Sequence, residues 1–167
     1  CADYSFFKKR KISKNLVKKK LKLKNNSIVV GYAGSINKVY LIREMILFFI
    51  NLKKTKKKMI FIFVTPHINE LKKIIDRNFD KEIYQSIKIF EADRNNIPYY
   101  FSSFDVMVSF IKKSFSRKAM SPTKMFESFA AGVPFICNKG IGDVDLIINK
   151  NKTGVVAEIE SINDKKK

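Results

Sequence analysis

The chain has 167 residues, the length of one domain, and 46% of them are apolar, which is enough for a buried core and excludes disorder as the default interpretation. The formal net charge is +19, and a charge of this size attracts polyanions such as nucleic acid, anionic lipid or nucleotide phosphate. A general compositional bias toward lysine is the simpler explanation. The basic residues are not interleaved with aromatic residues on a repeating face, so nucleic acid is not the favoured partner.

Cysteine usage and hydropathy indicate the compartment. The two cysteines, Cys1 and Cys137, suit neither a disulfide framework nor a metal site, so a reducing cytoplasm is the simplest location. The best candidate for a membrane span, 39–52, contains Arg43 and Glu44 and is shorter than the roughly 20 residues that a span needs. The chain begins with cysteine and no signal peptide, so we expect a fragment of a longer protein.

Residues 1–26 are strongly basic, and we predict an interdomain linker followed by a short solvated helix over 11–23. From residue 27 onward, short apolar runs alternate with helical segments. The predicted strands are 27–33, 59–65, 87–91, 105–110, 134–137 and 154–157. The predicted helices are 39–52, 68–77, 123–131 and 143–149, with a helical turn at 98–102. Residues 161–167 form a polar tail.

This alternation predicts an α/β fold, a Rossmann-like parallel sheet of about six strands with helices on both faces, over residues 27–160. In such sheets, ligands bind beyond the carboxyl ends of the strands, where the connectivity reverses. The loops to inspect therefore follow four of the strands, at 34–38, 92–97, 111–123 and 139–142.

The predicted helix at 123–131 begins in a way that suits an anion. Ser121 can cap it, Pro122 suits its first turn, and Thr123 and Lys124 lie at its start. A helix N-terminus presents unpaired backbone N–H groups and a partial positive charge, which favour phosphate. A lysine there opposes the helix dipole unless an anion is present, so Lys124 is a hint of an anionic ligand.

Glu127 follows Lys124 by three residues and lies on nearly the same face of the helix. Its carboxylate can accept two hydrogen bonds from the vicinal hydroxyls of a ribose while the helix start holds phosphates. The alternative is an exposed Lys–Glu pair that contributes a few tenths of a kcal/mol to helix stability.

Two glycine-containing turns follow predicted strands. Gly31 and Gly34 allow close backbone approach to a ligand, and Ser35 and Lys38 can reach a diphosphate; an ordinary strand-to-helix turn is the alternative. No Gly-x-Gly-x-x-Gly or Walker lysine motif is present. The segment 140–143, Gly-Ile-Gly-Asp, is either turn and cap chemistry or a floor under a donor sugar.

The run at 121–136, Ser-Pro-Thr-Lys-Met-Phe-Glu-Ser-Phe-Ala-Ala-Gly-Val-Pro-Phe-Ile, resembles the signature of glycosyltransferase family 4, whose members are retaining GT-B enzymes. The signature lies in their C-terminal, nucleotide-sugar-binding domain. The segments 30–35, 103–109 and 142–155 are similar to the family's segments in the same order. Asp3 and Phe7 resemble the end of its interdomain linker.

The resemblance implies that Glu127 binds the ribose and that Lys124 and the adjacent backbone contact the diphosphate. It implies no catalytic residue in this chain and no metal ion or other cofactor. The donor-binding residues that we predict are Glu127, Lys124, Thr123, Ser121, Gly34, Ser35, Lys38 and Gly142. Two departures concern the sugar contacts: Ala119 stands where many members have a second glutamate, and only Lys38 remains of an Arg and Lys pair after the first strand.

We therefore expect the donor-binding half of a hexosyltransferase that takes a nucleoside-diphosphate sugar. The acceptor site and any general base would lie in an N-terminal half, so this chain alone should bind donor and turn over little. Bacterial members with this signature build capsule, lipopolysaccharide or related glycans at the inner face of the cytoplasmic membrane, where a basic chain would suit anionic lipid or a lipid-linked acceptor. The alternatives are a nucleotide-sugar epimerase-like domain, a basic nucleic-acid-binding module, and an inactive scaffold.

Overall fold

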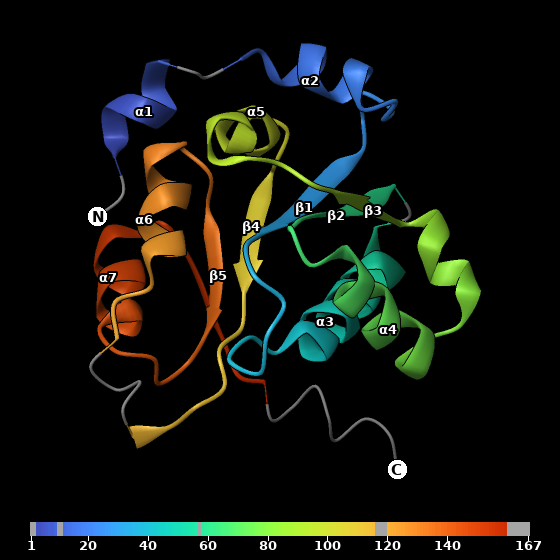
Figure 1. The fold of residues 1–167 in the computed structure, drawn as a ribbon. Coiled ribbons are helices and arrows are strands. Elements are labelled where there is room, and N and C mark those ends of the chain that lie inside the picture. Colours follow the sequence, from blue (N-terminus) through green and yellow to red (C-terminus); the bar gives the residue numbers. More distant parts are fainter. Residues whose placement is uncertain (1–2, 10–11, 57, 116–119, 160–167) are drawn as a thin grey trace.

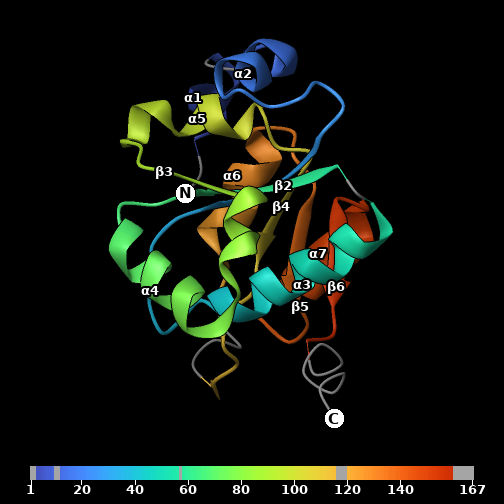
Figure 2. The ribbon, with the colours of Figure 1, turned by 90° about the vertical axis from the view of Figure 1, so that its right-hand side faces the viewer.

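The computed structural model describes residues 3–9, 12–56, 58–115 and 120–159, which form a sheet between two layers of helices (Figures 1 and 2). The strands are β1 (Ile28–Ala33), β2 (Met59–Val64), β3 (Ile87–Phe90), β4 (Val106–Ser109), β5 (Phe135–Asn138) and β6 (Gly154–Ala157). All neighbouring pairs are parallel, in the order β3-β2-β1-β4-β5-β6. The prediction of a parallel Rossmann-like sheet of about six strands is confirmed.

Helices cover both faces of the sheet. The α-helices are α1 (Tyr4–Lys9), α2 (Lys14–Lys20), α3 (Ile42–Thr55), α4 (Ile68–Asn78), α5 (Ile97–Phe101), α6 (Thr123–Ala130) and α7 (Val144–Asn151). Two short 3-10 helices, η1 (Lys81–Gln85) and η2 (Arg94–Asn96), flank β3. The longest helix, α3, has 14 residues, and within the described ranges no helix is long and apolar enough to cross a membrane.

The core lies on both sides of the sheet, which explains why the strands read as unbroken apolar runs. Helices α3 and α4 bury Phe49 and Leu71 against one face. On the other face, α6 and α7 bury Met125 and Ile148. The chain order reverses between β1 and β4, so the connections that leave these two strands diverge and open a crevice at their carboxyl ends.

The segment before the sheet is more structured than predicted. We predicted a linker and one helix over 11–23, but two helices form, and α1 was missed. Phe7, Val17 and Leu23 are buried, and the Phe7 ring lies 5.4 Å from the ring of Phe101. The domain boundary at residue 26 stays a prediction, although Phe7 and Leu23 belong to the same buried cluster as residues of the domain that follows.

Asp105 connects the segment before the sheet to β1 through hydrogen bonds. Its carboxylate accepts hydrogen bonds from Lys14 Nζ (2.7 Å) and Lys18 Nζ (3.4 Å) of α2 and from the amide of Val29 in β1 (2.8 Å). Lys18 is buried and also donates to the carbonyl of Ser27 (2.6 Å). Burial alone would raise the pKa of Asp105, but the hydrogen bonds from Lys14 and Val29 and the two lysine charges hold this pKa below its ordinary value.

Gly31, which we predicted to allow close approach of a ligand, is instead approached by a side chain. It lies inside β1, opposite Met107 of β4. A Cβ atom on Gly31 would lie 2.2 Å from the Phe104 ring, which is itself buried. The glycine therefore makes room for an aromatic ring of the core.

Candidate functional site

A cavity of about 250 Å³ lies at the carboxyl end of β1, between α1, α6 and the loop after β3. Three of the predicted donor-binding residues line it: Gly34, Lys124 and Glu127. The other lining residues are Asp3, Phe6, Phe7, Ala33, Ala92, Arg94 and Ile97. Residues of the motif at 121–136 and of the glycine turn after β1 thus line one cavity, and their binding of a donor stays a prediction.

The first turn of α6 forms one side of this site. Pro122 occupies the capping position, and no side chain caps the helix. The prediction that Ser121 caps it is wrong: its hydroxyl donates to Asp143 Oδ1 (2.8 Å), at the start of α7. The Met125 amide donates to the Pro122 carbonyl (3.1 Å). Among the described residues, no side-chain cap occupies the start of the helix, so its first N–H groups are suited to hold an anion.

The side chain of Lys124 crosses the turn after β1. Gly34 has a φ of +147°, which favours glycine, and a Cβ atom there would lie 2.3 Å from Lys124 Cε and 2.4 Å from its Nζ. The ammonium lies 4.8 Å from the centroid of the Tyr40 ring. Gly34 therefore has a definite role, since any larger residue would displace Lys124.

Glu127 lies one helical turn after Lys124 and faces the same cavity, so the two residues are not merely an exposed pair. Its side chain is half-buried. Burial raises the pKa of Glu127, and the positive charges of Lys124 and Arg94 oppose this effect. A half-buried carboxylate beside two cations is suited to accept hydrogen bonds from neutral hydroxyl groups.

The other five predicted residues, Ser121 among them, do not line the cavity. Thr123 is exposed at the start of α6, and Lys38 is exposed in the loop after β1. Ser35 is half-buried, and its carbonyl accepts a hydrogen bond from the Tyr32 hydroxyl (2.7 Å). Gly142 packs against the backbone of residue 120, because a Cβ atom there would lie 1.8 Å from the Met120 carbonyl oxygen. Their predicted contacts with a donor stay predictions.

Some sequence features lie outside the described residues. Ala119, the departure from the family pattern, is one of them, as are residues 116–118 of the same loop. Among the residues that the structure describes, no three or more His, Cys, Asp or Glu side chains are grouped so that they could hold a metal ion. The prediction that no metal is required stays a prediction.

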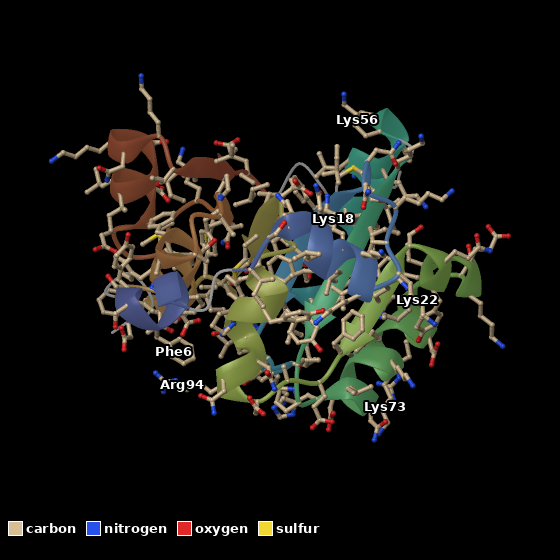
Figure 3. All side chains as sticks on the ribbon, turned by 90° about the horizontal axis from the view of Figure 1, so that it is seen from above. Phe6, Lys18, Lys22, Lys56, Lys73 and Arg94 are labelled. Carbon is tan, nitrogen blue, oxygen red and sulfur yellow. The ribbon has the colours of Figure 1, made fainter. Side chains whose placement is uncertain are left out.

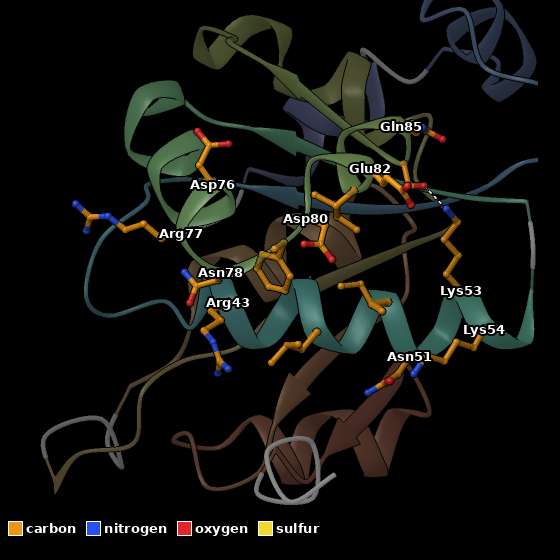
Figure 4. Close-up of a pocket in the computed structure, with 15 residues that line it drawn as sticks. Arg43, Asn51, Lys53, Lys54, Asp76, Arg77, Asn78, Asp80, Glu82 and Gln85 are labelled. Atoms are coloured by element: carbon orange, nitrogen blue, oxygen red, sulfur yellow. Dashed lines mark hydrogen bonds between the residues drawn. The ribbon is translucent and has the colours of Figure 1, made fainter. Parts of the chain in front are cut away.

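A second, larger cavity of about 1280 Å³ lies on the opposite helical layer (Figure 4). It is bounded by α3, by the end of α4 and by η1, with Arg43, Arg77 and Asp80 among its lining side chains. None of the predicted donor-binding residues lines it. We place the functional site at the smaller cavity because that cavity lies where the strand order reverses.

The sequence profile described as Glycosyl transferases group 1 matches residues 13–167 of the chain. The chain belongs to this family. The match covers the sheet, α6 and the glycine turn, and it includes all of the lining residues except Asp3, Phe6 and Phe7. No curated protein sequence matches the chain.

Solved structures of other glycosyltransferases share the fold. The C-terminal domain of the group 1 protein LpcC from Francisella tularensis has a TM-score of 0.68 and 19% identity, covering 99% of this chain and 85% of that one. WaaG, "a glycosyltransferase involved in lipopolysaccharide biosynthesis", has a TM-score of 0.68 and 12% identity over 95% of this chain. Anabaena Alr3699/HepE, solved with UDP and glucose, has a TM-score of 0.62 and 18% identity over 86% of this chain. The chain spans 42% of WaaG and 38% of HepE. As the match to the C-terminal domain of LpcC shows, its fold is that of the C-terminal domain of GT-B glycosyltransferases.

Two contributors to the site of this glycosyltransferase domain were missed. Arg94 of η2 and Phe6 of α1 both line the cavity, and Figure 3 shows them at the same side of the molecule. The loop 92–97 was marked by its position after the third strand, but nothing singled out Arg94 within it. Phe6 lies in a helix that we did not predict.

Proposed function

We propose that this chain is the donor-binding domain of a retaining glycosyltransferase that uses a nucleoside-diphosphate sugar. One observation supports this most directly: Lys124, Glu127 and Gly34 line a single cavity at the reversal point of a group 1 fold. HepE was solved with UDP and glucose, and the pneumococcal transferase GtfA with UDP and GlcNAc. The second ligand of each structure is a hexose or an N-acetylhexosamine.

Each part of the site has a proposed task. The N–H groups at the start of α6 and the ammonium of Lys124 hold the diphosphate, with Ser121, Thr123, Ser35 and Lys38 around it. Glu127 accepts hydrogen bonds from the ribose hydroxyls. We assign Ala92 and Ile97 as an apolar surface for the base, and Gly142 to the sugar side of the donor.

The proposed reaction is hexosyl transfer with retention at the anomeric carbon. The leaving nucleoside diphosphate gains charge as the glycosidic bond to phosphate breaks, and preorganised donors stabilise that charge. The helix start and Lys124 supply such donors without a metal ion. The acceptor site and any general base would come from an N-terminal domain, so we expect this domain alone to bind donor with little turnover.

A thermal-shift panel tests the proposal. We expect UDP or GDP to raise the melting temperature of the chain, since a ligand that binds only the folded state stabilises it by mass action. Glu127→Ala should abolish the shift. The matched control is Glu70→Ala, which removes an exposed glutamate of α4 and should leave the shift unchanged.

Other outcomes would support other functions. If only RNA or DNA raises the melting temperature, with a steep dependence on salt, the +19 charge indicates a nucleic-acid-binding module instead. If no nucleotide or nucleic acid has an effect, the domain is a scaffold. A nucleotide-sugar epimerase would interconvert sugars without an acceptor, which product analysis detects.

The finer context is also a proposal. We propose that the intact protein acts in the cytoplasm at the inner face of the membrane, in the synthesis of capsule, lipopolysaccharide or another surface glycan. The positive charge supports contact with anionic lipid, at about 1 kcal/mol for each suitably placed lysine or arginine. We expect the chain to sediment with anionic but not with neutral liposomes, and equal sedimentation with both would remove the membrane proposal.

A further inference from the structure

Three side chains form a stack between β1 and α6. The Tyr32 ring is fully buried, and the Tyr40 ring meets it edge-on, with 5.8 Å between centroids and 69° between planes. The ammonium of Lys124 lies over the Tyr40 ring, 4.8 Å from its centroid. That distance is within the roughly 6 Å at which a cation and an aromatic ring attract.

The backbone of Tyr40 is fixed by the strands on the other side of the crevice. Tyr40 forms an isolated antiparallel bridge with Ile111, just after β4. The amide of Leu41 donates to the Phe110 carbonyl (2.9 Å). Ile111 is in turn held by the Asn138 side chain, which bonds both its N–H (2.7 Å) and its carbonyl (2.9 Å). The backbone that positions the Tyr40 ring is therefore hydrogen-bonded to the segment just after β4, which is hydrogen-bonded in turn to β5.

The same stack orders the glycine turn. The hydroxyl of Tyr32 donates to the Ser35 carbonyl (2.7 Å), which fixes the chain directly after Gly34. Because Gly34 has no side chain, Lys124 can lie across the turn and reach Tyr40. The lysine is thus confined between the glycine backbone and the aromatic ring.

Lys124 needs such a partner. A lysine in the first turn of a helix is repelled by the helix dipole, and it also has several rotatable bonds to order. We propose that Tyr40 is a positioning residue: its ring holds the Lys124 ammonium at the start of α6 before a diphosphate binds. This inference rests on the proposed donor-binding function and assigns to Tyr40 a role in diphosphate affinity that acts through Lys124.

A double-mutant cycle tests the inference, with Kd for UDP and GDP as the measured quantity. Tyr40→Leu should raise Kd about fivefold, the effect of losing one partly exposed cation–π contact. Tyr40→Phe keeps the ring and should stay within about twofold of the unchanged chain. In a Lys124→Met background, Tyr40→Leu should have no further effect, because the partner is already gone.

A second measurement needs no ligand. In the unliganded chain, the ring current of Tyr40 should shift the ε-methylene protons of Lys124 upfield, and Tyr40→Leu should abolish that shift while Tyr40→Phe keeps it. An ordinary Lys124 chemical shift would overturn the inference, as would equal effects of Tyr40→Leu with and without Lys124. If neither nucleotide binds the unchanged chain, the proposed function fails first, and the two failures are thereby distinguished.

Discussion

Replacing Glu127 with glutamine is expected to raise the Kd for UDP or GDP about 100-fold, without lowering the melting temperature of the unliganded chain at pH 7. The affinity falls because an amide cannot replace the charge-assisted hydrogen bonds of a carboxylate to two hydroxyls, which contribute about 1.5–3 kcal/mol each. The stability does not fall, because the ionised Glu127 is half-buried at some cost to the folded state.

The pH dependence of Glu127 follows from the direction of its pKa. Burial raises this pKa above the ordinary value of 4.5. A raised pKa in the folded state means that protonation favours folding, and that this contribution is lost as the pH rises through the folded pKa. Glu127→Gln should therefore be as stable as the unchanged chain in acid, and equally or more stable at pH 7. Donor affinity of the unchanged chain should decline as the pH falls through the raised pKa.

Isothermal titration and thermal melts from pH 4 to pH 8 would measure both effects. Glu70→Gln is the control, since this exposed residue should change neither quantity. A variant that loses several degrees of melting temperature but binds UDP and GDP as before would assign Glu127 to structure instead of binding.

Asp105→Ala is expected to lower the free energy of unfolding by about 3 kcal/mol, the low end of the range for breaking a buried ion pair. The loss arises because Lys18, whose side chain is 5% exposed, would keep its charge without the carboxylate. The Val29 amide would also lose an acceptor. We expect a loss at the low end of the range for buried ion pairs because the Asp105 side chain is 32% exposed.

Urea denaturation at pH 7 and at pH 3 would measure this difference. The pKa of Asp105 is depressed in the folded chain, so its stabilising effect is present above the unfolded value of 3.8 and is lost as the pH falls through the folded pKa. The difference in the free energy of unfolding between Asp105→Ala and the unchanged chain should therefore be smaller in acid. Lys14→Ala is the control, because its side chain is 40% exposed and such pairs contribute about 0–1 kcal/mol. If Asp105→Ala and Lys14→Ala lower the free energy of unfolding equally, the buried pairing of Asp105 with Lys18 is refuted.

The sheet could be predicted because its strands are buried on both faces. Runs such as Met-Ile-Phe-Ile-Phe-Val in β2 leave little room for another interpretation. The helix α1 could not be predicted, because six residues are too few to show a helical period. Its Phe7 packs on Phe101, a contact far along the chain that no local pattern reveals.

For the candidate site, the sequence predicted only what residue spacing within one helix can indicate. Lys124 and Glu127 are spaced to share one helix face, and they do line the same cavity. The capping role of Ser121 was wrong because an acceptor 22 residues later, Asp143, takes its hydroxyl. The positions of the Phe104 ring and of the Arg94 side chain also depend on tertiary packing. Sequence spacing contains no information about either position.

The aromatic pair beside Lys124 also affects how the chain can be observed. The sequence has six tyrosines and no tryptophan, so its near-ultraviolet absorption and emission come almost entirely from tyrosine. Two of these chromophores, Tyr32 and Tyr40, meet at the glycine turn, and a charged group lies over one of them. A nucleotide whose phosphates bind the Lys124 ammonium would change the electrostatic surroundings of that ring. The intrinsic emission of the unlabelled chain thus contains an optical reporter located at the candidate site.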